Sequence, residues 1–172
     1  QGLTAGQLEY VRRWIEAGAP RTGNVVDTLV LRDTRLQTAT FTPLDAPASG
    51  TGIQLGVDSF AVAPTSEREL FVYRRVSNPT DLYVTRIVSR MRPGSHHLLL
   101  YQFDETKTAF PCNSRPTPDA IRDIRNADGS PNVVNMLPMA CHVFFAGAMN
   151  PDFDYRFPPG VALKLPANTS LD

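Results

Sequence analysis

The sequence predicts a mainly β protein: an antiparallel β-sandwich of the jelly-roll kind, preceded by one N-terminal α-helix. Only one stretch spaces its apolar residues as an amphipathic helix does. The rest alternates short apolar or β-branched runs with turn sequences, which is typical of antiparallel sheets. The 172 residues include 15 prolines and 11 glycines, so much of the chain is expected in turns and loops.

The helix is predicted from about residue 5 to residue 17. Thr4 is an N-cap residue and Gln7 completes a capping box. Leu8, Val11 and Ile15 follow helical spacing, and a glycine and a proline end the segment. We therefore divide the chain into a helix at 1–22, connecting strands and a linker at 23–59, and a β domain at 60–172.

The expected strands are short and lie between turn sequences. They cover 25–31, 36–41, 70–76, 82–91, 96–103, 141–146 and 161–165, with a short helical turn at 119–125. Seventeen basic residues balance seventeen acidic ones, which argues against a nucleic-acid-binding or polybasic membrane-surface protein. No apolar run is long enough to span a bilayer.

The two cysteines, Cys112 and Cys141, allow one disulfide or two buried free thiols in a cytosolic protein. We favour the disulfide, because Cys112 lies in a proline-rich loop where a free thiol would be exposed. This predicts an exported protein, periplasmic or extracellular. The chain begins at Gln1 rather than Met, so we expect a processed chain or a piece of a longer one.

The candidate metal ligands are the three histidines, His96, His97 and His142. Neighbouring residues of a regular strand point to opposite faces, so His96 and His97 can share one ion only at an irregular strand entrance. The preceding Pro93–Gly94 turn provides such an entrance. Imidazoles suit copper, zinc, iron or nickel. The alternative is a pair of core or rim histidines with satisfied hydrogen bonds.

His142 follows Cys141, so the disulfide could bring it toward the histidine pair as a third ligand. The alternative is a buried strand histidine. Three methionines, Met136, Met139 and Met149, could act as soft ligands, but methionine more often fills gaps in a core.

The stretch from 60 to 103 contains ERELFVYRRV and DLYVTRIVSRMRPGSHHLLLYQF. It resembles the N-terminal copper domain of the type II, ascorbate-dependent copper monooxygenases, which carry a vicinal histidine pair followed by aliphatic and aromatic residues. Further along, FPPGVALKLPANTSLD is similar to the segment that leads to an LQ-x-HY strand in that family. The resemblance implies an electron-transfer copper site at His96 and His97, with His142 or a histidine beyond Asp172 as the third ligand.

The sequence also departs from this family. Two cysteines near the histidine pair are replaced, one by a residue among Leu70, Phe71 and Val72 and the other by Phe103. The second copper site has no counterpart in these residues. The resemblance therefore implies half of a monooxygenase, which could bind copper and pass an electron but could not hydroxylate a substrate.

The N-terminal segment LTAGQLEYVRRWIEAGAP resembles the last helix of a bacterial c-type cytochrome domain, although no CxxCH haem site occurs. The implied partners are a cytochrome domain and a second copper domain, in the same or a neighbouring chain. The alternative function is a structural β-sandwich subunit of an extracellular or surface assembly. Such a subunit could self-assemble through an open strand edge.

Overall fold

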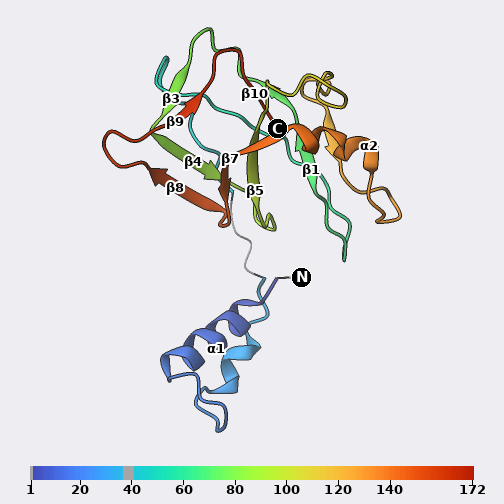
Figure 1. Cartoon of the computed structure of the whole chain (residues 1–172). Helices are drawn as coiled ribbons and strands as arrows, with labels where there is room; N and C mark the ends of the chain where they lie inside the picture. The colour runs from blue at the N-terminus through green and yellow to red at the C-terminus, as the bar shows by residue number, and fades with distance from the viewer. Residues whose placement is uncertain (1, 37–40) are drawn as a thin grey trace. The chain divides into compact units, whose positions relative to one another are not determined.

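The computed structural model describes residues 2–36 and 41–172. The chain forms two compact units, Gln1–Thr42 and Pro43–Asp172, which are described separately (Figure 1). The strand pairs of the described residues are all antiparallel, and one of their two α-helices is N-terminal. The prediction of a mainly β, antiparallel protein with an N-terminal helix is therefore confirmed.

The first unit is built around helix α1, Ala5–Glu16. The predicted capping box is present: the Thr4 hydroxyl accepts from the Gln7 N–H, and the Gln7 side chain accepts from the Thr4 N–H. On the exposed face, Glu9 pairs with Arg12 and Arg13, and these hydrogen bonds lower the Glu9 pKa to about 2. The helix ends within one residue of its predicted limit.

The strand predicted at 25–31 is wrong, because a 3₁₀ helix, η1, covers Thr28–Arg32. The Asp27 carboxylate accepts from the Leu29 N–H and so caps this turn. Gly6 of α1 lies against η1, where a Cβ atom would stand 2.2 Å from the Val30 carbonyl oxygen. Capping and packing against α1 therefore outweigh the β-branched composition. The strand predicted at 36–41 falls mostly on 37–40, outside the described residues.

The second unit contains a four-stranded sheet in the order β2-β10-β5-β7 (Figure 1). Its strands are Arg74–Arg75, Ser170–Leu171, Leu98–Phe103 and His142–Ala148, respectively. Helix α2, Val133–Met136, and the 3₁₀ helix η2, Leu137–Cys141, lead into β7.

Three two-stranded ladders complete this unit. They pair β1 (Leu70–Val72) with β6 (Ile121–Asp123), β3 (Leu82–Val84) with β9 (Leu163–Leu165), and β4 (Arg86–Arg90) with β8 (Asp152–Arg156). The helical turn predicted at 119–125 is wrong, because β6 pairs there with β1. Ile124 extends that pairing by donating to the Glu69 carbonyl at 3.0 Å.

The single strand predicted at 82–91 is divided into β3 and β4 at Thr85. Their partners β9 and β8 are separated by residues 157–162, which include Pro158 and Pro159. Proline has no N–H to donate to a strand ladder, so the pairing is interrupted there. Phe157 donates to the Thr85 carbonyl at 2.9 Å and joins the two ladders across the break.

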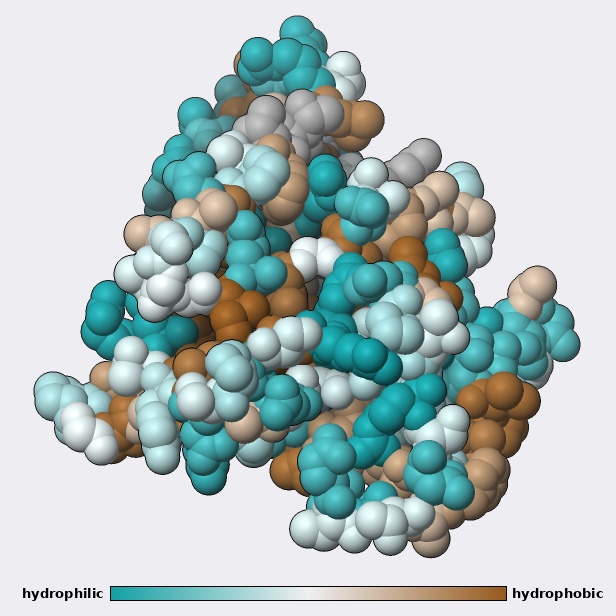
Figure 2. All heavy atoms as spheres, turned by 90° about the horizontal axis from the view of Figure 1, so that it is seen from above, coloured by the Kyte–Doolittle hydropathy of each residue, from teal (hydrophilic) through white to brown (hydrophobic). Residues whose placement is uncertain are grey.

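The buried core of this unit is small and includes the predicted disulfide. Cys112 and Cys141 are bonded, which confirms the pairing, and both pack with Tyr73 and Phe103. The Tyr73 hydroxyl and the Ser170 hydroxyl are hydrogen-bonded at 2.8 Å. Large apolar side chains also reach the surface, as the brown areas of Figure 2 show. Among the described residues, no helix is both long enough and apolar enough to cross a membrane.

Candidate metal site

His96 and His97 lie in the connection between β4 and β5, residues 91–97. Pro93 and Gly94 form a turn in this connection, and Gly94 takes a positive φ of 91°. Strand β5 begins at Leu98, directly after the histidine pair. The irregular strand entrance predicted from the sequence is therefore present, and the alternation of side chains along a strand does not constrain the two histidines.

The two imidazole rings lie against each other at the surface. Their centroids are 3.8 Å apart, with an angle of 25° between the ring planes, and both residues are exposed. Two nitrogens that each bind one ion at about 2 Å lie at most about 4 Å apart, and rings whose centroids are 3.8 Å apart can bring two nitrogens that close. The lone pair of an imidazole nitrogen points outward in the plane of its ring, whereas these two rings stack face to face. The rings would therefore rotate about their side-chain torsions from this stacked arrangement, which exposed side chains can do.

The arginine that ends β4, directly before this connection, forms an ion pair. Arg90, the last residue of β4, donates to the Asp152 carboxylate at 2.9 Å across the β4–β8 ladder. The same ladder carries Arg86 paired with Asp154, and this contact lowers the Asp154 pKa. These carboxylates offset the charges of Arg86 and Arg90, and Arg92 adds a further positive charge within the connection itself.

His142 does not join the other two histidines. It is the first residue of β7 and pairs with Phe103, the last residue of β5. Leu98, where the histidine pair meets the strand, is five residues away, about 17 Å along an extended chain. The disulfide joins the loop that follows β5 to the start of β7, so it holds His142 at the end of the sheet opposite to the pair. The expected three-histidine set is therefore not formed.

The His142 ring is instead part of the packed interior, and its side chain is only 4 % exposed. It stacks on Tyr101 at 4.8 Å between centroids and meets the edges or faces of Phe71 and Phe103. Its Nε2 lies 3.0 Å from a carboxylate oxygen of Asp172. His142 thus matches the alternative considered from the sequence, a buried strand histidine with a hydrogen-bond partner.

Sequence reasoning missed the buried ion cluster around Asp172. The Asp172 carboxylate is 0 % exposed and accepts from the Arg122 guanidinium through both oxygens, besides its contact with His142. Arg122 comes from β6, and Asp172 follows β10 directly. These residues lie 50 positions apart and no local pattern links them. The cluster is a structural contact that fixes the end of β10.

The methionines proposed as soft ligands separate in the structure. Met136 ends α2 and Met139 lies in η2, both before β7 and therefore near its His142 end in sequence. Met149 follows Ala148, the last residue of β7, whose partner is Leu98. Of these three methionines, Met149 is the one that follows the strand end nearest the histidine pair.

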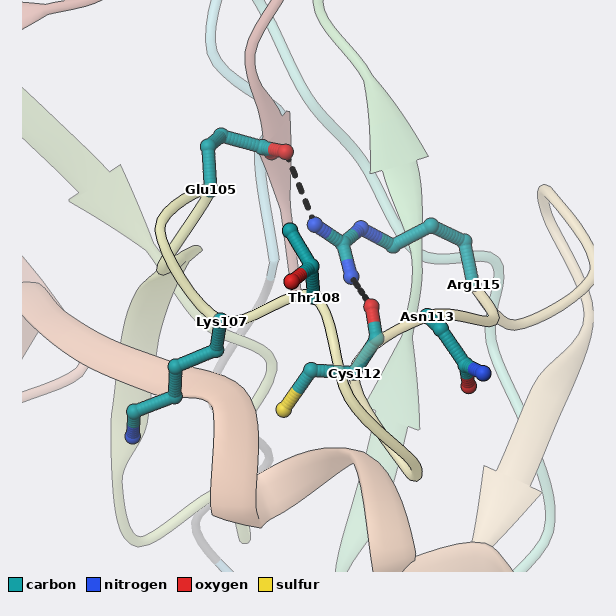
Figure 3. A pocket seen from close by; sticks show the side chains of 6 residues that line it. All are labelled: Glu105, Lys107, Thr108, Cys112, Asn113 and Arg115. Carbon is teal, nitrogen blue, oxygen red and sulfur yellow. Dashed lines mark hydrogen bonds and ion pairs between the residues drawn. The ribbon is translucent and has the colours of Figure 1, made fainter.

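A separate hollow of about 430 Å³ lies beside the disulfide (Figure 3). Arg115 bridges it, donating to Glu105 at 2.8 Å and to the Cys112 carbonyl at 2.5 Å. Lys107 donates to the Ala140 carbonyl at 2.8 Å. Both cations are thus engaged by the protein itself, and Cys112 is held in the disulfide. The hollow lacks the free charged groups that would mark a binding site.

Across residues 2–36 and 41–172, no group of three or more histidine, cysteine, aspartate or glutamate side chains is arranged to hold a metal ion. A site at His96 and His97 therefore needs a further donor of another kind, or one from outside these residues. Comparison of the chain with protein-family models, curated proteins and solved structures found no match.

Proposed function

We propose that this chain carries the copper-binding electron-transfer domain of a monooxygenase-like, exported oxidoreductase. The observation that carries the proposal is the adjacency of the His96 and His97 rings, exposed at an irregular strand entrance and 3.8 Å apart. The HHLLLY sequence supports copper over other imidazole-binding metals through its resemblance to the type II copper monooxygenases.

The donor chemistry fits copper. Neutral imidazoles bind both oxidation states of copper, and the ion would supply one-electron chemistry when bound. His96 and His97 would hold it, while the Pro93–Gly94 turn before them and the start of β5 at Leu98 after them fix where the two rings stand. Two imidazoles alone leave the coordination incomplete, so a third donor is required.

A histidine following Asp172 is one candidate for the third donor. Strand β10 runs antiparallel to β5, with Leu171 opposite Gln102. Asp172 and Tyr101 then exchange two backbone hydrogen bonds of 3.0 Å. If this pairing continued, each further residue would advance one position toward the histidine pair, and the fourth residue after Asp172 would lie opposite His97. A histidine at that position would be well placed to bind the same ion.

The proposal extends to architecture and location. The antiparallel ladders would belong to a β-sandwich of the jelly-roll kind, and the disulfide accords with an oxidising periplasmic or extracellular compartment. A second copper domain and a c-type cytochrome domain, in the same or a neighbouring chain, would be its electron-transfer partners. Hydroxylation would require the second copper domain, because the family activates oxygen there.

The test is copper uptake by variants of the three histidines. The protein should bind one equivalent of Cu(I), and the His96→Ala/His97→Ala double variant should bind none while keeping its far-ultraviolet circular dichroism. His142→Gln is the matched control and should retain the copper, because His142 lies at the other end of β5. Unchanged copper binding in the double variant would refute the proposal.

The second candidate function is a structural subunit that assembles through a strand edge. In the order β2-β10-β5-β7, strand β7 lies at an edge of the four-stranded sheet, and among the described residues no further strand pairs with its outer side. An uncovered strand edge can accept another strand. Concentration-dependent self-association in sedimentation, together with no copper uptake, would favour this function over the first.

A further inference from the structure

Two connections converge at the end of the sheet where the histidine pair lies. Residues 91–97 join β4 to β5, and residues 149–151 join β7 to β8. Leu98 pairs with Ala148, and the Met91 N–H donates to the Pro151 carbonyl at 2.7 Å. The two connections are therefore joined at one end by strand pairing and at the other end by a backbone hydrogen bond.

The register at the ends of β5 and β7 points to Met149 as the neighbour of the histidine pair across the two connections. The pairs run Leu100↔Ala146, Leu99↔Gly147 and Leu98↔Ala148, and the same register carried one step past the strand ends would place His97 opposite Met149. Residues directly opposite each other in an antiparallel pair have Cα atoms about 4.5–5.5 Å apart and side chains on the same face. A nitrogen and a sulfur that bind one ion at about 2.0 and 2.3 Å lie at most about 4.3 Å apart, which this spacing permits.

The Met149 side chain is available for such a contact. It is 64 % exposed, so its thioether is not taken up by core packing. Its three rotatable bonds let the sulfur turn toward the neighbouring connection. Thioethers and imidazoles are both donors that Cu(I) accepts, and a neutral thioether adds no charge that would favour Cu(II).

We propose that the Met149 thioether is a ligand of the copper held by His96 and His97, which makes this a His₂Met site that favours Cu(I). The inference rests on the proposed function, because it assigns a further donor to the same ion. It supplies the third donor from within this chain, and it leaves the side of β5 next to β10 open for any additional ligand.

The test measures Cu(I) affinity by competition with a chromophoric chelator in variants of equal size. Met149→Leu should weaken Cu(I) binding at least tenfold, because losing even a partner outside the ligand sphere typically costs 10–100-fold in metal affinity. Met139→Leu, in η2, is the matched control and should leave the affinity unchanged. Met149→His should restore tight binding by replacing the sulfur donor with a nitrogen donor.

X-ray absorption at the copper edge gives a second readout that does not depend on affinity. The unaltered protein should show one sulfur neighbour near 2.3 Å, and Met149→Leu should lose it. Wild-type affinity in Met149→Leu, or loss of the sulfur neighbour in Met91→Leu instead, would overturn this inference while His96→Ala/His97→Ala still abolished uptake. Copper binding that survives the double histidine variant would instead overturn the proposed function itself.

Discussion

Replacing Arg122 by methionine is expected to lower the free energy of unfolding of the second unit by about 3–5 kcal/mol. The side chains of Arg122 and Asp172 are 11 % and 0 % exposed, so their ion pair is buried. Removing one partner of a buried pair leaves the other charge without compensation, and that is what makes the change costly. Methionine keeps most of the length of the side chain, so the loss of charge accounts for most of the expected loss of stability.

The contacts that Asp172 would lose and keep explain the size of this loss in the free energy of unfolding. Without Arg122, both oxygens of the Asp172 carboxylate lose the guanidinium, and only Oδ2 keeps a partner, the His142 Nε2 at 3.0 Å. Hydrogen bonds to charged groups contribute about 1.5–3 kcal/mol each, so the loss of two matches the expected range. Arg122 also lies 5.4 Å from the centre of the Phe71 ring, a cation–π contact that the variant loses as well.

Urea denaturation followed by circular dichroism is the assay. With a denaturant slope of about 1–3 kcal/mol/M, the midpoint should fall by about 1 M or more. Arg86→Met is the matched control, because its pair with Asp154 is 46 % and 55 % exposed and should contribute at most about 1 kcal/mol. The double variant Arg122→Met/Asp172→Asn should recover part of the loss, since no buried charge remains unpaired.

Arg122→Lys provides a milder form of the same test if the methionine variant does not fold. Lysine keeps a positive charge but cannot contact both carboxylate oxygens as a guanidinium does. The free energy of unfolding of Arg122→Lys should therefore lie between the values for the unaltered protein and for Arg122→Met. If Arg122→Met changed stability no more than Arg86→Met does, the burial and energetic importance assigned to the Asp172 cluster would be wrong.

Three further predictions concern other parts of the chain. Replacing Cys112 and Cys141 by serine should cost about 3–4 kcal/mol in urea denaturation, because the bond closes a loop between residues 29 positions apart; a loss below about 1 kcal/mol would contradict this. Gly6→Ala should disrupt the packing of α1 on η1, seen as faster amide exchange, since its Cβ would stand 2.2 Å from the Val30 oxygen; unchanged exchange would argue against that contact. Glu9 should titrate near pH 2 by carboxyl NMR, because two arginines lower its pKa from 4.5, so its ion pairs stabilise the helix fully above pH 4.5 and weaken as the pH falls toward 2; a midpoint near 4.5 would show that the pairs do not persist in solution.

The sequence predicts the features of the fold that depend on neighbouring residues. The capping box at Thr4 and Gln7 lies within four residues, and both ends of α1 follow from such local signals. Segment 25–31 has the β-branched residues of a strand, yet its conformation depends on Gly6, some 20 residues earlier, and on the Asp27 cap. A contact over that distance leaves no pattern within the segment itself.

At the candidate site too, features set by adjacent residues could be predicted, and features set by distant residues could not. The irregular entrance at His96 and His97 could be predicted, because the Pro93–Gly94 turn that creates it is adjacent in sequence. The buried partner of His142 could not, because Asp172 reaches it only through the insertion of β10 between β2 and β5. The order of strands in a sheet is a long-range property, and the residues of β10 carry no sign of which neighbours it will have.

The direction of β7 explains both the error at His142 and the inference at Met149. A disulfide from Cys141 to the loop after β5 predicts that the two strands are neighbours, but the Cys112 end of that loop follows the last residue of β5, not the first. The start of β7 is therefore held at the far end of β5, and an antiparallel strand must then run back toward the histidine pair. Seven residues of β7 cover the six of β5 with one irregularity in register, and carrying this register one step past Leu98↔Ala148 would place Met149 opposite His97. The constraint that separates His142 from His96 and His97 is thus the same one that would bring the Met149 thioether to the proposed metal site.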